Sequence, residues 1–221
     1  MSNVPKLRFR EFDGEWCCHL LGNLCDIKTG SRDTQDRIDG GKYPFFVRSQ
    51  TIERINSYSF DGEAILTAGD GVGVGKVFHY LNSKFDYHQR VYNIHNFRDD
   101  AIGKFVYYFF AERFYPRVKQ LSAKNSVDSV RMEMISKMEI HLPSIEEQQK
   151  IADFLTAVDT KIEQLTRKEE LLKQYKKGLM QKIFSQEIRF KADDGSEFPE
   201  WEEVKLEDFP ELEHGDGDWI L

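Results

Sequence analysis

Cysteine is scarce in this chain, and long apolar runs are absent. The 221 residues include three cysteines, Cys17, Cys18 and Cys25. They are odd in number and no second Cys/His pair completes a zinc pattern, so we expect reduced, structural thiols. No run reaches the roughly 18 apolar residues of a membrane-spanning helix. The first residues also lack an apolar signal segment, which predicts a cytoplasmic protein.

Motifs that would indicate an enzyme are lacking as well. Residues 69–76 contain four glycines and end in Lys76, but Val77 stands where a Walker phosphate loop needs Ser or Thr, and the glycine spacing is wrong. A hairpin connection remains, or a loop whose N–H groups and Lys76 meet a DNA phosphate. The histidines lack metal-site spacing, and nucleophile-elbow, nuclease and methyltransferase motifs are missing. We therefore expect no catalytic residue, metal or cofactor.

Basic charge is not in excess overall, since the net charge is −7. Residues 1–143 carry 20 Lys and Arg against 18 Asp and Glu, and residues 144–190 carry 9 against 8. Residues 191–221 carry 2 against 12. The acidity therefore belongs to the last segment, and the remainder is mildly basic, which leaves room for a local basic face.

One long helix is the strongest feature that is present. From Ser144 to about Ser185, apolar residues recur at alternating spacings of four and three, as in a coiled-coil seam. Pro143 precedes Ser144, and Glu147 follows three residues later, which predicts a capping box. Such a seam needs a partner helix. Its apolar members include Ile151, Leu155, Val158, Ile162, Leu165, Leu172 and Leu179, with Glu169 and Lys176 as polar positions.

An internal repeat follows this helix. Ile188-Arg189-Phe190-Lys191 matches Leu7-Arg8-Phe9-Arg10, and Glu200-Trp201 matches Glu15-Trp16 after a four-residue insertion. The repeat predicts a unit made of a leader, a globular domain and a long helix, followed by the start of a second unit. We expect three segments: a globular domain at 1–143, the helix at 144–187, and an acidic, poorly ordered start of a second repeat at 188–221.

The globular part predicts an α+β fold. Short strands are expected at residues 43–48, 57–60, 64–67, 77–80, 85–87, 90–94 and 139–142, with a turn at Asp61-Gly62. Helices are expected at 101–115, ended by Pro116, and at 130–138. The fold class is thus a β-rich domain with a few helices, followed by one coiled-coil helix.

Side chains that can form paired hydrogen bonds gather in the predicted loops. Arg matches the hydrogen-bonding edge of guanine, and Gln or Asn that of adenine, in the DNA major groove. An ordinary solvated surface is the alternative for each residue. The predicted DNA-binding residues are Arg32, Gln35, Arg37, Arg48, Gln50, Lys76, His88, Gln89, Arg90, Lys124 and Asn125.

The start of the long helix, Leu142-Pro143-Ser144-Ile145-Glu146-Glu147-Gln148-Gln149-Lys150-Ile151, resembles the conserved region of type I restriction–modification specificity subunits. The leader at 7–16, its return at 188 and the glycine-containing segment 62–77 are similar to the same family. The resemblance implies a non-catalytic, sequence-specific DNA-binding subunit that reads one half of a bipartite site.

The resemblance further implies partners. These are double-stranded DNA, methyltransferase subunits that use S-adenosylmethionine, and, through them, ATP-driven restriction subunits. The resemblance implies two recognition domains and two long helices in a complete subunit, whereas this chain holds one recognition domain and one helix. We therefore expect a second copy, or another half-subunit, to supply the partner helix in a dimer. The alternatives are a coiled-coil adaptor without DNA contact and an independent enzyme such as a nuclease.

Overall fold

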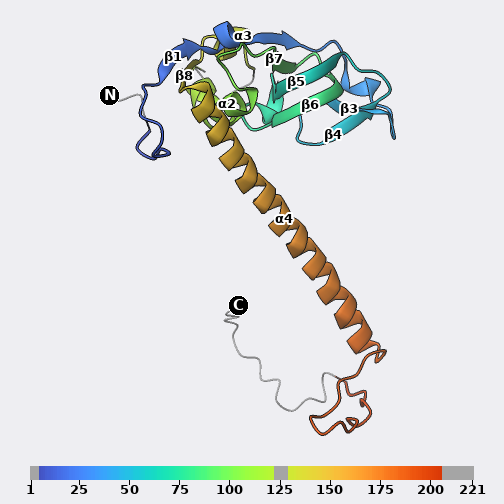
Figure 1. Cartoon of the computed structure of the whole chain (residues 1–221). Coiled ribbons are helices and arrows are strands. Elements are labelled where there is room, and N and C mark those ends of the chain that lie inside the picture. Colours follow the sequence, from blue (N-terminus) through green and yellow to red (C-terminus); the bar gives the residue numbers. More distant parts are fainter. Residues whose placement is uncertain (1–4, 122–128, 206–221) are drawn as a thin grey trace. The chain divides into compact units, whose positions relative to one another are not determined.

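The computed structural model describes residues 5–121 and 129–205. It divides into two compact units, Met1–Lys161 and Ile162–Leu221. The first holds a six-stranded sheet, a two-stranded sheet and short helices, and the long helix begins within it (Figure 1). The predicted α+β fold with one long helix is confirmed.

The elements follow each other in a strand-rich order with helices gathered near the end. The strands are β1 (Cys17–Leu20), β2 (Asp26–Thr29), β3 (Tyr43–Phe46), β4 (Ile52–Ile55), β5 (Phe60–Ala68), β6 (Phe78–Tyr87), β7 (Val91–His95) and β8 (Glu139–Leu142). The helices are α1 (Leu21–Leu24), α2 (Gly103–Leu121), α3 (Met132–Ser136) and α4 (Ile145–Phe184), with single 3-10 turns at Thr34–Asp36 and Gly71–Gly73.

The large sheet has the order β2-β7-β5-β6-β3-β4, and only the β3–β6 pair is parallel. It must curl strongly. Phe85 of β6 pairs with Phe60 at the start of β5, whereas Val91 of β7 pairs with Ala68 at its end. The two ends of β5 are about 26 Å apart along a flat strand. The four steps from Tyr87 to Val91 span at most about 14 Å.

The two faces of this curled sheet bury different apolar clusters. The outer face carries Ile65 and Ile94 and packs against the aromatic side of α2. The inner face carries Leu66, Phe46 and Phe85, which fill the inside of the curl. The alternation of Ile65 and Leu66 thus serves two cores, which explains why residues 64–68 are all buried and, apart from Thr67, apolar.

Helix α2 corrects one prediction, because it runs through Pro116 to Leu121 instead of ending there. Phe114 and Val118 lie on either side of the proline and are both fully buried. Arg117 donates through Nε to the carbonyl of Met134 at 2.8 Å and also to that of Lys137. This burial and anchoring hold the last turn despite the backbone hydrogen bond that proline cannot form.

The strand predictions were partly wrong. Asp61-Gly62 lies inside β5 rather than in a turn, and the predicted strands at 77–80 and 85–87 are one continuous strand, β6. Strands β1, β2 and β4 were not predicted. Strand β8 and the short helix α3 lie where the sequence placed them, the helix with a narrower span than the predicted 130–138. Interruptions by polar residues at the surface explain the broken pattern of β6.

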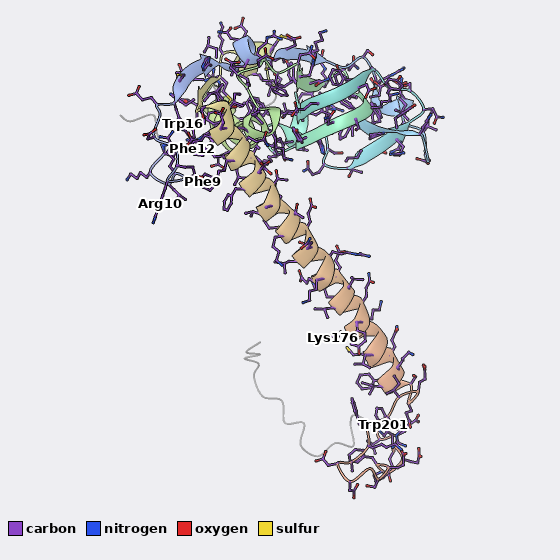
Figure 2. All side chains as sticks on the ribbon, in the orientation of Figure 1. Phe9, Arg10, Phe12, Trp16, Lys176 and Trp201 are labelled. Carbon is purple, nitrogen blue, oxygen red and sulfur yellow. The ribbon has the colours of Figure 1, made fainter. Side chains whose placement is uncertain are left out.

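The start of α4 confirms the cap but only half of the capping box. The Ser144 hydroxyl accepts the backbone N–H of Glu147 at 3.3 Å. The Glu147 carboxylate does not return to Ser144 but binds the guanidinium of Arg8 instead. Arg8 comes from the first leader, defined here as residues 7–16, whose Phe9 and Trp16 are labelled in Figure 2.

The predicted seam of α4 is half-buried at its start and exposed beyond. Ile151 packs against the core, while the exposed fractions of Ile162, Leu165 and Leu172 are 56%, 53% and 56%. About 40 residues at 1.5 Å each make a rod about 60 Å long. The rod therefore presents an uncovered apolar stripe. Among the described residues, no helix is long and apolar enough to cross a membrane.

The segment after α4 is described to residue 205. Arg189 donates to the Glu200 carboxylate at 3.2 Å and to the carbonyl of Phe198. Trp201 lies 6.1 Å from the ring of Phe184 at the end of the helix. We define residues 188–201 as the second leader, which the sequence predicted to be poorly ordered and which here forms local contacts; the acidic residues 206–221 lie outside the described part.

Replacing Phe110 by Ala tests the core between α2 and the sheet. Phe110 is fully buried, with its ring centroid 4.4 Å from that of Phe114 and 5.6 Å from that of Phe78. We expect the free energy of unfolding in urea to fall by about 3–5 kcal/mol. Val72→Ala, at a side chain that is 94% exposed, should change it by less than about 0.5 kcal/mol. Equal decreases in the free energy of unfolding for the two variants would contradict the packing of Phe110 in the core.

Candidate nucleic-acid interface

The curl of the sheet brings four loops together. The N–H of His88 donates to the carbonyl of Phe46 at the end of β3, and the N–H of Gly69 donates to the carbonyl of Arg90. His88 also forms a bridge with Arg32, after β2. Loops 30–36, 47–51, 69–77 and 88–90, far apart in sequence, therefore meet where the sheet closes.

Asp70 is the centre of charge in this group of loops. Its Oδ1 accepts Nη1 of Arg48 at 3.1 Å, and its Oδ2 lies 3.7 Å from Nε of Arg90. The Arg48 and Arg90 side chains are 46% and 66% exposed, whereas that of Asp70 is 22% exposed. One carboxylate thus holds two arginines side by side at the surface. Sequence reasoning missed Asp70; its place in a glycine loop between two Arg-containing loops was the available signal.

Arg32 has a different environment from the other two arginines. Its Nε donates to Asp86 at 3.1 Å and its Nη2 to the hydroxyl of Ser57 at 3.0 Å. Asp86 is fully buried and also accepts the hydroxyls of Ser57 and Ser59. A buried carboxylate requires such partners. Arg32 is therefore committed to holding the loops together, with 39% of its side chain exposed.

His88 and Gln89 connect the same loops. The Nδ1 of His88 accepts the N–H of Arg90 at 2.9 Å, which leaves its proton on Nε2, 3.9 Å from Asp33. Nε2 of Gln89 donates to the Asp33 carboxylate at 3.1 Å. Gln89 is exposed and His88 is buried, so Gln89 can present its amide outward while His88 supports the backbone beneath it.

The remaining described members of the predicted DNA-binding set do not share these side-chain contacts. Arg37 lies 3.6 Å from Glu53 on β4, and Gln35, Gln50 and Lys76 are exposed. Lys124 and Asn125 lie outside the described residues. The structure therefore joins Arg32, Arg48, His88, Gln89 and Arg90 in one group and places Arg37 against β4.

The glycine loop is a hairpin connection between β5 and β6, as one interpretation of the sequence held. Gly71 has a φ of 73°, which favours glycine, and a Cβ on Gly73 would lie 2.2 Å from the carbonyl oxygen of Arg48. The close approach sets this loop against loop 47–51. Val72, 94% exposed, stands between these two glycines and was not singled out by the sequence.

This arrangement supplies hydrogen-bond donors and positive charge but no reaction centre. Within residues 5–121 and 129–205, no group of three or more His, Cys, Asp and Glu side chains could hold a metal ion. Guanidinium and amide groups on rigid loops suit recognition of base edges and phosphates. The fold and this surface together are typical of a recognition module.

The family comparison agrees with that class of protein. Residues 14–174 match the family described as the type I restriction modification DNA specificity domain, and the chain belongs to this family. The resemblance inferred from the helix start, leader and glycine loop is thereby confirmed. Members of this family serve DNA specificity, which agrees with the expectation that the chain is a non-catalytic component.

Individual relatives show how much of such a protein the chain represents. It is 29% identical over 171 residues to the type I restriction enzyme EcoDI specificity subunit of Escherichia coli, covering 77% of this chain and 37% of the relative. It is 31% identical over 103 residues to the MjaVIII specificity subunit of Methanocaldococcus jannaschii, covering 44% and 24%. The chain spans less than half the length of these relatives.

Solved structures share the fold. The type I restriction–modification S subunit from M. genitalium superposes with a TM-score of 0.67 at 23% identity, over 84% of this chain and 49% of that one. The HsdS subunit from Thermoanaerobacter tengcongensis gives 0.51 at 17% identity, over 81% and 46%. Both resemblances cover about half of the solved chain.

Two buried histidines, His88 and His95, and the half-buried His79 predict a pH dependence. Burial lowers the pKa of His79, His88 and His95 below the ordinary 6.5, and the positive charge of Arg48 lowers the pKa of His88 further. The unfolded chain therefore binds more protons near this pH, so stability is fully present above the unfolded pKa and is lost as the pH falls.

We expect the free energy of unfolding in urea to decrease as the pH is lowered from about 7.5 to about 5.5. His88→Asn, which retains an acceptor for the Arg90 N–H, should reduce the slope. A free energy that is constant or rises over this interval would contradict the assignment.

Proposed function

We propose that this chain is a sequence-specific DNA-binding specificity subunit that reads one half of a bipartite site and docks methyltransferase subunits. S-adenosylmethionine and ATP would be bound by those partners and by restriction subunits, not by this chain. The observation that carries the proposal is the pair of arginines, Arg48 and Arg90, held by Asp70 on loops of a domain from the DNA specificity family.

The loop chemistry supports direct contact with DNA. Arg90 and Gln89 stand on a connection of three residues whose backbone is fixed on both sides by β6 and β7. A backbone fixed in this way reduces the entropy that is lost when a side chain on it binds a base edge. Val72 could add an apolar contact to a thymine methyl group from the neighbouring loop. Asp70 repels phosphate, so its role is to orient Arg48 and Arg90 rather than to contact DNA itself.

The uncovered stripe of α4 supports the second part of the proposal. An exposed apolar seam over several turns indicates a helical partner. A second copy that pairs antiparallel would place two recognition domains with two-fold symmetry and would favour a palindromic split site. The length of α4 would then fix the distance between the two half-sites. The stripe also suits a coiled-coil adaptor without DNA contact. A measurement of DNA binding distinguishes such an adaptor from a specificity subunit.

Arg90→Ala tests DNA recognition. Loss of a paired contact to guanine should weaken binding of the target duplex by about 1–3 kcal/mol, with the methyltransferase subunits present. Binding is measured by fluorescence anisotropy on the duplex identified from methylation mapping, and on a scrambled duplex. The loss should be larger for the target, because base contacts carry the discrimination.

Arg98→Ala is the matched control, since it removes the same charge beyond the other end of β7, where Arg98 pairs with Asp26 at 2.9 Å. It should leave target affinity near that of the unaltered protein. If both substitutions act equally, or neither acts, Arg90 does not read DNA.

Leu165→Glu with Leu172→Glu tests the seam of α4. Two charges within the apolar stripe should convert a dimer into monomers, because they cannot be buried against a partner helix without compensation. The mass is measured by sedimentation velocity. Thr160→Glu with Gln174→Glu adds the same charge on the opposite side of the heptad pattern and should leave the dimer intact. An unchanged mass in the seam variant would refute this assignment.

A further inference from the structure

The first leader is attached to the start of α4 by a buried ion pair. Nε and Nη2 of Arg8 donate to the two carboxylate oxygens of Glu147 at 2.7 and 2.6 Å. The Glu147 side chain is only 1% exposed, and that of Arg8 is 13% exposed. A carboxylate buried to this extent requires a cationic partner, so this position must be occupied by an arginine or its equivalent.

Aromatic and apolar contacts accompany this ion pair. The Phe9 ring meets Phe154 edge-on at 5.9 Å, and Nζ of Lys150 lies 4.9 Å from the Phe9 ring centroid. Lys150 also pairs with Glu11. A cavity of about 400 Å³, lined by leader and helix residues, remains between the two segments. The first leader thus packs against the start of α4 and leaves part of the space between the two segments unfilled.

The second leader carries the same groups, but its carboxylate and its phenylalanine are exposed. Arg189, Phe190 and Trp201 correspond to Arg8, Phe9 and Trp16. The Glu200 carboxylate that Arg189 contacts is 86% exposed, and Phe190 is 66% exposed. The Arg189 side chain is 20% exposed and also donates to the carbonyls of Phe198 and Pro199, but its one carboxylate partner among the described residues lies in solvent, where an ion pair contributes little. A buried carboxylate is the better partner.

The second leader cannot reach Glu147 of its own chain while α4 is intact. Glu147 lies in the first turn of α4, and Phe184 is its last residue, about 55 Å further along the helix. The five residues from Phe184 to Arg189 span at most about 18 Å when fully extended. Only Glu147 of another molecule is within reach of Arg189.

We propose that the second leader docks on the first turns of α4 of a second copy, in place of that copy's first leader. Arg189 binds Glu147 there, and Phe190 packs against Phe154. This inference rests on the proposed antiparallel pairing of α4, in which the end of one helix lies beside the start of the other. Each first leader can then be replaced by the second leader of the other copy, and the second leaders link the two copies.

One sequence difference between the two leaders should affect how strongly each binds the start of α4. Ala192 stands at the position of Glu11, so the second leader lacks the carboxylate that pairs with Lys150. Lys150→Ala should therefore weaken the hold of the first leader more than that of the second. The substitution should therefore favour occupancy of the first turns of α4 by the second leader of the other copy.

The test uses the full chain with a photo-activated benzophenone side chain in place of Phe190. This protein is mixed with isotopically heavy, unaltered protein, and cross-links between light and heavy peptides are identified by mass spectrometry. We expect light–heavy cross-links from position 190 to residues 147–158 of the other copy. Arg189→Ala should remove most of them, Lys191→Ala should retain them as the matched control, and Lys150→Ala should increase them.

Cross-links confined to one copy, a chain that stays monomeric, or light–heavy cross-links unaffected by Arg189→Ala would overturn the proposal. DNA binding is measured on the same samples. A dimer that binds its target but gives no such cross-link refutes only the docking. Cross-links in a protein that does not bind DNA with its methyltransferase partners refute the proposed function instead.

Discussion

The three-residue connection between β6 and β7 is the constraint on which the grouping of the four loops depends. Residues 88–90 must join the end of β6, which lies beside the start of β5, to the start of β7, which lies beside the end of β5, so the sheet has to curl. The curl encloses the inner core around Phe46, Leu66 and Phe85 and draws the ends of β3 and β5 toward the connection. Without it, Arg48, Asp70 and Arg90 would lie on separate edges of the sheet.

Acidic residues organise the basic ones on this surface. Asp86, buried, holds Arg32 as part of the scaffold, whereas Asp70, nearer the solvent, holds Arg48 and Arg90 where they can exchange partners. The difference in burial separates an arginine held within the scaffold from two that are more exposed. The position of each carboxylate therefore decides which arginines face the solvent, although the domain has only a small excess of positive charge.

Local sequence patterns predicted the long helix and its cap but only part of the strands. The heptad spacing gave α4, and Ser144 gave its cap, because both signals lie within a few residues. Long-range contacts escaped such reasoning. Glu147 follows Ser144 at capping-box spacing, yet it binds Arg8, 139 residues away. Pro116 failed to end α2 because buried neighbours hold the helix. The grouping of Arg48 with Arg90 depends on the curl, which no local pattern contains, and the one signal for Asp70 was its place in a glycine loop between two Arg-containing loops.

On the proposed function, the loops gathered by the curl are the surface that meets DNA. Hydrogen–deuterium exchange of the full chain with methyltransferase subunits, with and without target duplex, examines this surface. We expect DNA to slow exchange in residues 47–51, 69–77 and 88–90, and to leave residues 96–98 at the other end of β7 unchanged. Protection around residues 96–98, with none in the three loops, would contradict it.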